Sequence, residues 1–199
     1  MSNKYKIEFR GYSPSLPSRR NLDLKYSKSC DRDKIIKALD MDFFHKCGYC
    51  GWGSTAYSQE SFQIDHFNPT IKNKEQDSYQ NYVYACPICN KTKKRYVCEF
   101  DPISKEYSSL FIRNDYGLIQ TNKNINPAIQ KKADVILVKI GLCKDIHAFD
   151  YFMMLLNRID ENIRRSGRSK ELADDKDLCE SIASILSKLI KRATYYKRF

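Results

Sequence analysis

The sequence predicts an α+β fold, in which two short strands and one short helix surround a four-cysteine metal site and a helical extension follows. Three observations predict this fold. Two Cys-x-x-Cys pairs, Cys47 with Cys50 and Cys86 with Cys89, can supply four ligands to one metal ion. The sequence from the first pair to the second contains two strand-like segments, and the residues after 128 carry apolar side chains at helical spacing.

Residues 1–45 are expected to form an N-terminal extended segment followed by a helix. The apolar residues before position 29 alternate only weakly. Ser29 and Asp31 can cap the N-terminus of a helix, and Ile35 and Leu39 then fall on one of its faces. This helix should end before the glycine-rich turn that holds the first cysteine pair.

Residues 46–128 are expected to form the central, zinc-stapled domain. Residues 61–66 alternate between apolar and polar side chains, which predicts a strand. Residues 81–86, Asn-Tyr-Val-Tyr-Ala-Cys, are predicted to form a second strand. A short lysine-rich helix should begin near Ile88. The remainder of this region has an irregular or hairpin-like pattern, with a turn signal at 114–117.

Residues 129–199 are expected to form a C-terminal helical region. Apolar stripes predict helices at about 129–140, 144–166 and 170–196. The last two stripes are joined by a short loop around a glycine, a pattern typical of an antiparallel helical hairpin. The stripes are therefore interpreted as core positions.

The composition favours a polyanionic partner, most simply nucleic acid, because the net charge is +11. A solvated basic surface without such a partner is the alternative interpretation of this charge. No apolar run reaches the ~18 residues of a membrane span, and the N-terminus lacks the apolar stretch of a signal peptide. We therefore expect a cytoplasmic protein without a membrane partner, whose thiols stay reduced.

The four paired cysteines are expected to bind one structural zinc ion. Four thiolates complete the tetrahedral coordination of Zn²⁺ and leave no position open for a substrate. A single pair would also fit a redox motif, but two pairs in a reducing compartment favour zinc. The pairs are separated by 35 residues, more than the ~15–20 of a compact zinc ribbon. The additional residues include Asp65 and His66, at the end of the first predicted strand.

The segment from Cys47 to about Lys94 resembles the HNH nuclease family. It contains Cys-Gly-Tyr-Cys, then Ile-Asp-His-Phe-Asn-Pro, then Asn-Tyr-Val-Tyr-Ala-Cys-Pro-Ile-Cys-Asn-Lys-Thr-Lys. The most specific parts are Asn81 and the ending Cys-x-x-Cys-Asn-x-x-Lys, in which Asn90 takes the last position of the motif. The resemblance implies a ββα-metal fold and an endonuclease that hydrolyses phosphodiester bonds, with DNA as the expected substrate.

The resemblance also implies a role for each matching residue. His66 corresponds to the general base, Asp65 and Asn90 to the ligands of one catalytic Mg²⁺ or Mn²⁺ ion, and Asn81 to a brace for the histidine and its loop. A hard cation held by few oxygen ligands keeps positions open for phosphate and water. Each of these residues alone would more simply be a core or turn residue, so the inference depends on their combination.

Four basic side chains follow Asn90 closely and are expected to contact the nucleic-acid backbone. Alternatively, these side chains only form one solvated face of a helix. They are Lys91, Lys93, Lys94 and Arg95.

The order of the parts also resembles the stand-alone HNH subunits of bacterial anti-phage systems, notably the nuclease partner of an ABC-type ATPase in Septu and related retron systems. This narrower resemblance implies that the helical region 129–199 docks an ATPase. The competing function is a non-catalytic zinc-containing subunit that binds nucleic acid or a protein partner. That function gives Asp65, His66 and Asn90 no common task.

Overall fold

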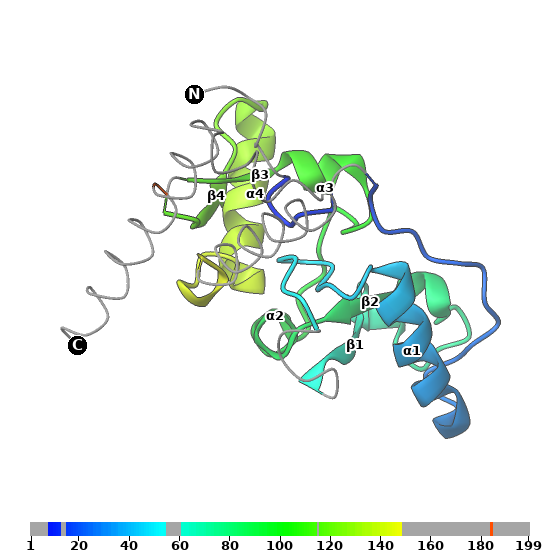
Figure 1. Cartoon of the computed structure of the whole chain (residues 1–199). Coiled ribbons are helices and arrows are strands. Elements are labelled where there is room, and N and C mark those ends of the chain that lie inside the picture. The colour runs from blue at the N-terminus through cyan, green and yellow to red at the C-terminus, as the bar shows by residue number, and fades with distance from the viewer. Residues whose placement is uncertain (1–7, 13–14, 55–60, 115, 149–183, 185–199) are drawn as a thin grey trace, which may run out of the picture.

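The computed structural model describes residues 8–12, 15–54, 61–114, 116–148 and 184, and it confirms the α+β class (Figure 1). Two small antiparallel hairpins, each flanked by helices, make up this described part. Its elements, in chain order, are α1 (Arg32–Asp42), β1 (Gln63–His66), β2 (Tyr82–Ala85), α2 (Pro87–Lys93), α3 (Lys105–Ser109), β3 (Phe111–Arg113), β4 (Ile119–Thr121) and α4 (Pro127–Ile140).

The first hairpin, β1–β2, positions the residues of the predicted active site. Asp65 pairs with Val83 and His66 pairs with Tyr82 across the antiparallel ladder. Burial along β1 increases from its exposed first residue to Asp65 and His66, whereas all four residues of β2 are buried. Helix α1 packs against both strands, and α2 packs against β1 (Figure 1). The two predicted strands are therefore present, each slightly shorter than expected.

Helix α1 forms where the sequence predicts it, but its start differs from the expectation. A 3-10 turn over Ser29–Asp31 precedes the helix, and neither side chain caps it. The Asp31 carboxylate instead accepts a hydrogen bond from the backbone N–H of Lys25, at 3.2 Å. Ile35 and Leu39 are fully buried against the hairpin, so the predicted apolar face is correct.

Helix α2 begins at Pro87, directly after Cys86, the first cysteine of the second pair. The Cys86 side chain accepts a hydrogen bond from the backbone N–H of Cys89, at 3.4 Å, and so acts as the N-cap. Pro87 occupies the first helical position, where its missing N–H costs nothing and its fixed φ suits a helix. The sequence Cys-Pro-x-Cys thus starts the helix and brings two sulfur atoms to its first turn.

The second half of the described chain contains a second hairpin and two helices. The turn predicted at 114–117 joins β3 to β4, which confirms the expected hairpin. The five-residue helix α3 was not predicted, because it is too short for an apolar period to appear. Asn126 caps α4 by accepting from the N–H of Ala128, and Gly141, with φ 79°, ends it.

Helix α4 corresponds to the first of the three C-terminal helices expected from the sequence. The other two, at about 144–166 and 170–196, and the hairpin that they would form, lie almost wholly outside the described residues. The expected domain boundaries at 46 and 129 stay predictions.

A buried arginine fastens the N-terminal segment to the rest of the protein. Arg10 is fully buried, and its guanidinium donates to the carbonyl oxygens of Gly48, at 2.7 Å, and Pro102, at 2.6 Å. It also forms an ion pair with Glu8 at 3.0 Å. Gly51 has φ 80°, and a Cβ there would lie 2.2 Å from the Arg10 carbonyl oxygen, so glycine permits this close approach. The sequence predicted only an extended lead-in here.

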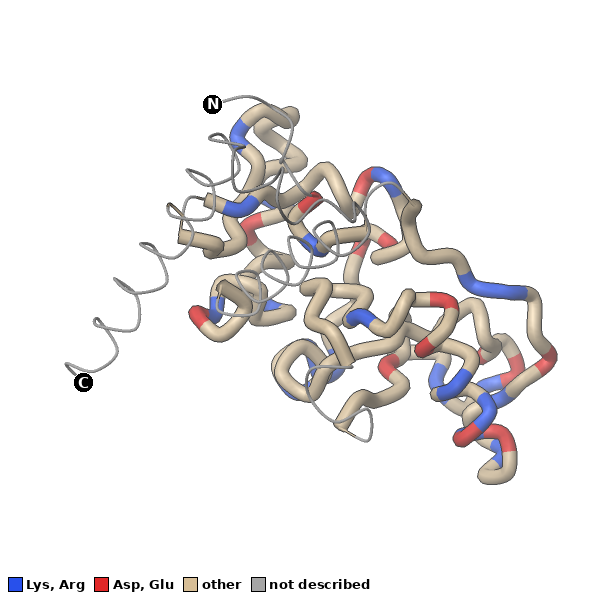
Figure 2. Tube along the Cα trace, viewed as in Figure 1, with Lys and Arg blue, Asp and Glu red and all other residues tan. Residues whose placement is uncertain are grey.

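The charged side chains are distributed over the whole described trace. Figure 2 shows basic and acidic residues interspersed in both halves of the described fold. Among the described helices, none has the length and apolar character needed to cross a membrane.

Candidate functional site

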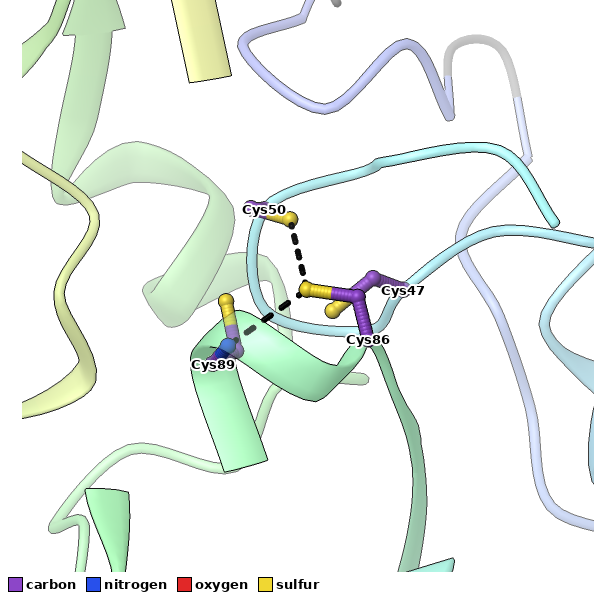
Figure 3. A group of neighbouring side chains, drawn as sticks. All are labelled: Cys47, Cys50, Cys86 and Cys89. Carbon is purple, nitrogen blue, oxygen red and sulfur yellow. Dashed lines mark hydrogen bonds between the residues drawn. The ribbon is translucent and has the colours of Figure 1, made fainter. Parts of the chain in front are cut away.

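The four predicted cysteine ligands converge in the core. Their sulfur atoms lie within 4.8 Å of one another, and all four residues are buried. Figure 3 shows the sulfurs from the turn and from the start of α2 pointing toward a common centre. The Cys50 and Cys86 sulfurs are 3.8 Å apart, which equals the edge of ~3.8 Å expected for a tetrahedron with Zn–S bonds of ~2.3 Å. The cluster can therefore hold a zinc ion.

The surroundings of this cluster disfavour the ionisation of all its thiols together. Burial raises the pKa of Cys50 and the pKa of Cys89 well above the usual range of a thiol. Burial also acts to raise the pKa of Cys47, but hydrogen bonds from the other three cysteines hold it well below that range. Thiolates in such a site need a bound metal, and zinc binding then releases protons. The turn that carries the first pair is held against β2, because the N–H of Gly48 donates to the Tyr84 carbonyl at 2.8 Å.

The imidazole of His66 is buried at the edge of a cleft and is held by a carboxylate. Its Nε2 lies 3.1 Å from Oδ2 of Asp77, and its ring meets the rings of Tyr26 and Tyr82 edge-on at 4.9 and 5.1 Å. Burial lowers the pKa of His66, the Asp77 carboxylate opposes this shift, and the Lys72 ammonium adds to it. The imidazole is therefore neutral near pH 7. With Nε2–H donating to Asp77, Nδ1 carries the lone pair that can accept a proton.

Asn81 is connected to His66 through Asp77. The Asn81 amide donates to Asp77 Oδ1 at 3.1 Å, while Asp77 Oδ2 also accepts from the N–H of Asn73 at 2.9 Å. The same amide pairs with the backbone of Asn68, accepting its N–H at 2.8 Å and donating to its carbonyl at 3.0 Å. Asn81 thus holds both the loop after β1 and the carboxylate that orients His66. The sequence reasoning missed Asp77, because nothing in its spacing separates it from other residues of a polar loop.

Asp65 lies beside a buried lysine and a buried tyrosine. The Tyr49 hydroxyl donates to its Oδ2 at 2.5 Å, and the Lys93 ammonium lies 3.0 Å from the same oxygen. Burial raises the pKa of Asp65, and the Lys93 charge opposes that shift. Lys93 also donates to the His66 carbonyl at 2.8 Å, so one ammonium holds the backbone and the carboxylate at the end of β1.

The position of Lys93 corrects one expectation. It was expected on the surface with three other basic residues, but its side chain is 0% exposed. The reason is helical phase: Cys89 and Lys93 are four residues apart and share the inward face of α2. Lys91, Lys94 and Arg95 are exposed, as expected.

Asp65, His66 and Asn90 line one cleft of about 980 Å³. No hydrogen bond joins Asp65 to Asn90; the Asn90 amide nitrogen instead donates to the Gln63 side chain at 2.5 Å. The cleft lies between the start of α1, strand β1, the loop after β1 and the end of α2. Its basic residues are Arg32, Lys72, Lys94 and Arg95. Arg32 and Lys72 were not singled out by the sequence, because their place beside the cleft depends on tertiary packing.

Residues 47–95 match the family model described as HNH endonuclease. The matched segment begins at the first zinc-site cysteine, includes the β1–β2 hairpin and ends just after α2. An HNH endonuclease domain in this segment supports a nuclease-type function and implies a nucleic-acid substrate. No curated protein and no solved structure gives a significant match to the chain.

Removal of one cysteine ligand should remove the zinc and destabilise the protein. We expect the purified chain to contain one zinc ion, and Cys89→Ser to lose it together with the cooperative thermal transition, because structural zinc binding is coupled to folding. Elemental analysis and circular dichroism measure both effects. Cys30→Ser, at an exposed cysteine outside the cluster, should leave them unchanged. A Cys89→Ser protein with full zinc content would contradict the assignment.

Replacement of the buried lysine should destabilise the protein far more than replacement of its neighbour. Lys93→Met leaves the Asp65 carboxylate buried without its cation, which should cost about 3–5 kcal/mol of unfolding free energy. Lys94→Met, at an exposed residue, should change it by less than about 0.5 kcal/mol. Urea denaturation of the zinc-loaded proteins gives both values. Equal stabilities of the two variants would show that the ion pair contributes nothing.

Proposed function

We propose that this protein is a metal-dependent endonuclease that hydrolyses phosphodiester bonds of nucleic acid, with DNA as the first candidate substrate and His66 as the general base. The observation that carries the proposal is the single cleft lined by Asp65, His66 and Asn90, within the segment that matches the HNH endonuclease model. A non-catalytic zinc subunit would give no reason for a neutral, carboxylate-held imidazole at that cleft.

In this proposal His66 takes the proton from the attacking water. Its Nδ1 accepts the proton, and the Asp77 carboxylate at Nε2 stabilises the imidazolium that forms. Asn81 fixes Asp77 in turn, so the base is held in one orientation before the substrate arrives. Asp77 and Asn81 are positioning residues, since both act through His66.

Asp65 and Asn90 would hold the catalytic divalent cation. A carboxylate and an amide oxygen are donors suited to Mg²⁺ or Mn²⁺, and both residues line the cleft. The Asn90–Gln63 hydrogen bond uses the amide nitrogen, so Asn90 Oδ1 takes no part in it. When bound, such an ion neutralises charge that develops on the phosphate. The buried Lys93 ammonium would then be the second positive charge beside Asp65, after the metal ion.

The exposed basic residues at the end of α2 fit contacts to the substrate backbone. Lys94 and Arg95 line the cleft beside Asn90. Cationic side chains there would hold phosphates in register without reading the base sequence. Lys91 is exposed but does not line the cleft, so we place it at the margin of the contact.

His66→Ala should abolish cleavage while the protein stays folded. General-base catalysis contributes about 10²–10⁴-fold, so plasmid nicking in Mg²⁺ or Mn²⁺ should fall by at least about 100-fold. Gel electrophoresis measures the cleavage, and zinc content with circular dichroism measures the fold. Asp77→Asn should lower kcat with little change in KM, because it disturbs the base and not substrate binding.

Lys91→Ala provides the matched control, since it removes a charge near the cleft without touching the base. It should retain cleavage within a few-fold. Full activity of His66→Ala would overturn the proposed role of the histidine. Cleavage that persists in the wild-type protein without any added divalent ion would overturn the proposed metal dependence.

A place in a bacterial anti-phage system, with an ABC-type ATPase as partner, stays a prediction from the order of the parts. If it is correct, the full chain should co-purify with such an ATPase when the two are expressed together. A chain that ends at residue 143 should not co-purify, while it keeps its zinc. Equal co-purification of both chains would argue against docking through the C-terminal region.

A further inference from the structure

Two cations lie over one tyrosine ring in the cleft. The Arg32 guanidinium carbon is 4.6 Å from the centre of the Tyr26 ring, and the Lys72 ammonium is 4.8 Å from it. The three residues come from three segments: the chain before α1, the start of α1, and the loop between β1 and β2. Arg32 Nε also donates to the Tyr26 carbonyl at 3.1 Å, which fixes the guanidinium further. The same ring meets His66 edge-on at 4.9 Å, so both charges lie near the proposed base.

These cations have no carboxylate partner among the described residues. Arg19, Arg20 and Lys93 each form an ion pair with an aspartate, whereas Arg32, Lys72, Lys94 and Arg95 form none within the described part. The cleft-lining carboxylates are Asp33, which is exposed, and Asp65, which is already bound by Lys93. The cleft therefore carries an excess of uncompensated positive charge.

The arrangement around Tyr26 suits an anion. An aromatic face attracts each cation, by about 0.5–1 kcal/mol at an exposed site, but the two like charges repel each other. A phosphate close to these cations would reduce that repulsion and gain charge-assisted hydrogen bonds. Because the Tyr26 ring and the backbone hydrogen bond restrain the side chains in advance, less conformational entropy is lost on binding.

We propose that Arg32 and Lys72, held on Tyr26, form a phosphate clamp for the substrate strand. The clamp acts together with Lys94 and Arg95, so the strand is held from α1 and the loop as well as from the end of α2. This inference rests on the proposed nuclease function and extends it. Tyr26 and Arg32 lie before residues 47–95, so the clamp assigns a substrate-binding role to the chain outside the HNH match.

The salt dependence of nucleic-acid binding tests the clamp. Fluorescence anisotropy with a labelled mixed-sequence DNA duplex, in buffer without divalent ions, gives the affinity over a series of NaCl concentrations. Each phosphate contact contributes about 0.9 to the slope of log K against log salt. The double variant Arg32→Ala/Lys72→Ala should therefore bind more weakly and reduce the slope by about 1.8. Arg32→Lys, which keeps the charge, should retain most of the slope.

The matched control is Lys34→Ala/Lys37→Ala, which removes two exposed charges from the same helix outside the cleft. Its slope should equal that of the wild-type protein, and zinc content should be equal in all variants. An unchanged slope for Arg32→Ala/Lys72→Ala, while Lys94→Ala/Arg95→Ala lowers it, would overturn the clamp and leave the proposed nuclease standing. Equal losses in the clamp and control variants would also overturn it. A wild-type protein that binds no DNA or RNA would overturn both proposals.

Discussion

The four-cysteine cluster is the constraint on which the rest of the described structure depends. It joins the turn after α1 to the first turn of α2, and the β1–β2 hairpin lies between those two points along the chain. Because both ends of the insertion are fixed, α2 must lie against β1. Residues from the strand and from the helix therefore line the same cleft, although 24 residues separate Asp65 from Asn90 in the sequence. A zinc ion in that cluster would stabilise the architecture of the cleft without taking part in its chemistry.

Helix α2 connects the core to the cleft through its periodicity. Its inward face carries Cys89 and Lys93, and the latter holds Asp65 and the backbone of His66. The residues that follow these two, Asn90 and Lys94, line the cleft. One short helix thus supplies a metal-site sulfur, an internal counter-ion, a candidate metal ligand and a candidate phosphate contact. A change in the rotation of α2 about its axis would disturb all four at once.

Local patterns in the sequence were sufficient for most elements and for the motif residues. The cysteine spacing, the two strands and helices α1, α2 and α4 depend on near neighbours in the chain, and the structure has them close to where they were predicted. The expected side-chain caps of α1 are absent, and the short helix α3 was not predicted. Asp77, Arg10 and the pair on Tyr26 could not be found in this way, because each acts on residues that only the tertiary fold brings close. Lys93 was misplaced because it was grouped by charge with Lys91, Lys94 and Arg95, without regard to the face of the helix on which it lies.

The Arg10 contacts make the N-terminal segment part of the unit that folds around the cysteine cluster. The guanidinium binds the cysteine turn, at Gly48, and the segment before α3, at Pro102, while α1 packs against both strands of the β1–β2 hairpin. An excised fragment limited to the family match, residues 47–95, would leave the Gly48 carbonyl without its donor and expose the apolar side chains that α1 covers. Transfer of the HNH-matching segment to another scaffold would therefore require the N-terminal segment with Arg10 and helix α1 as well.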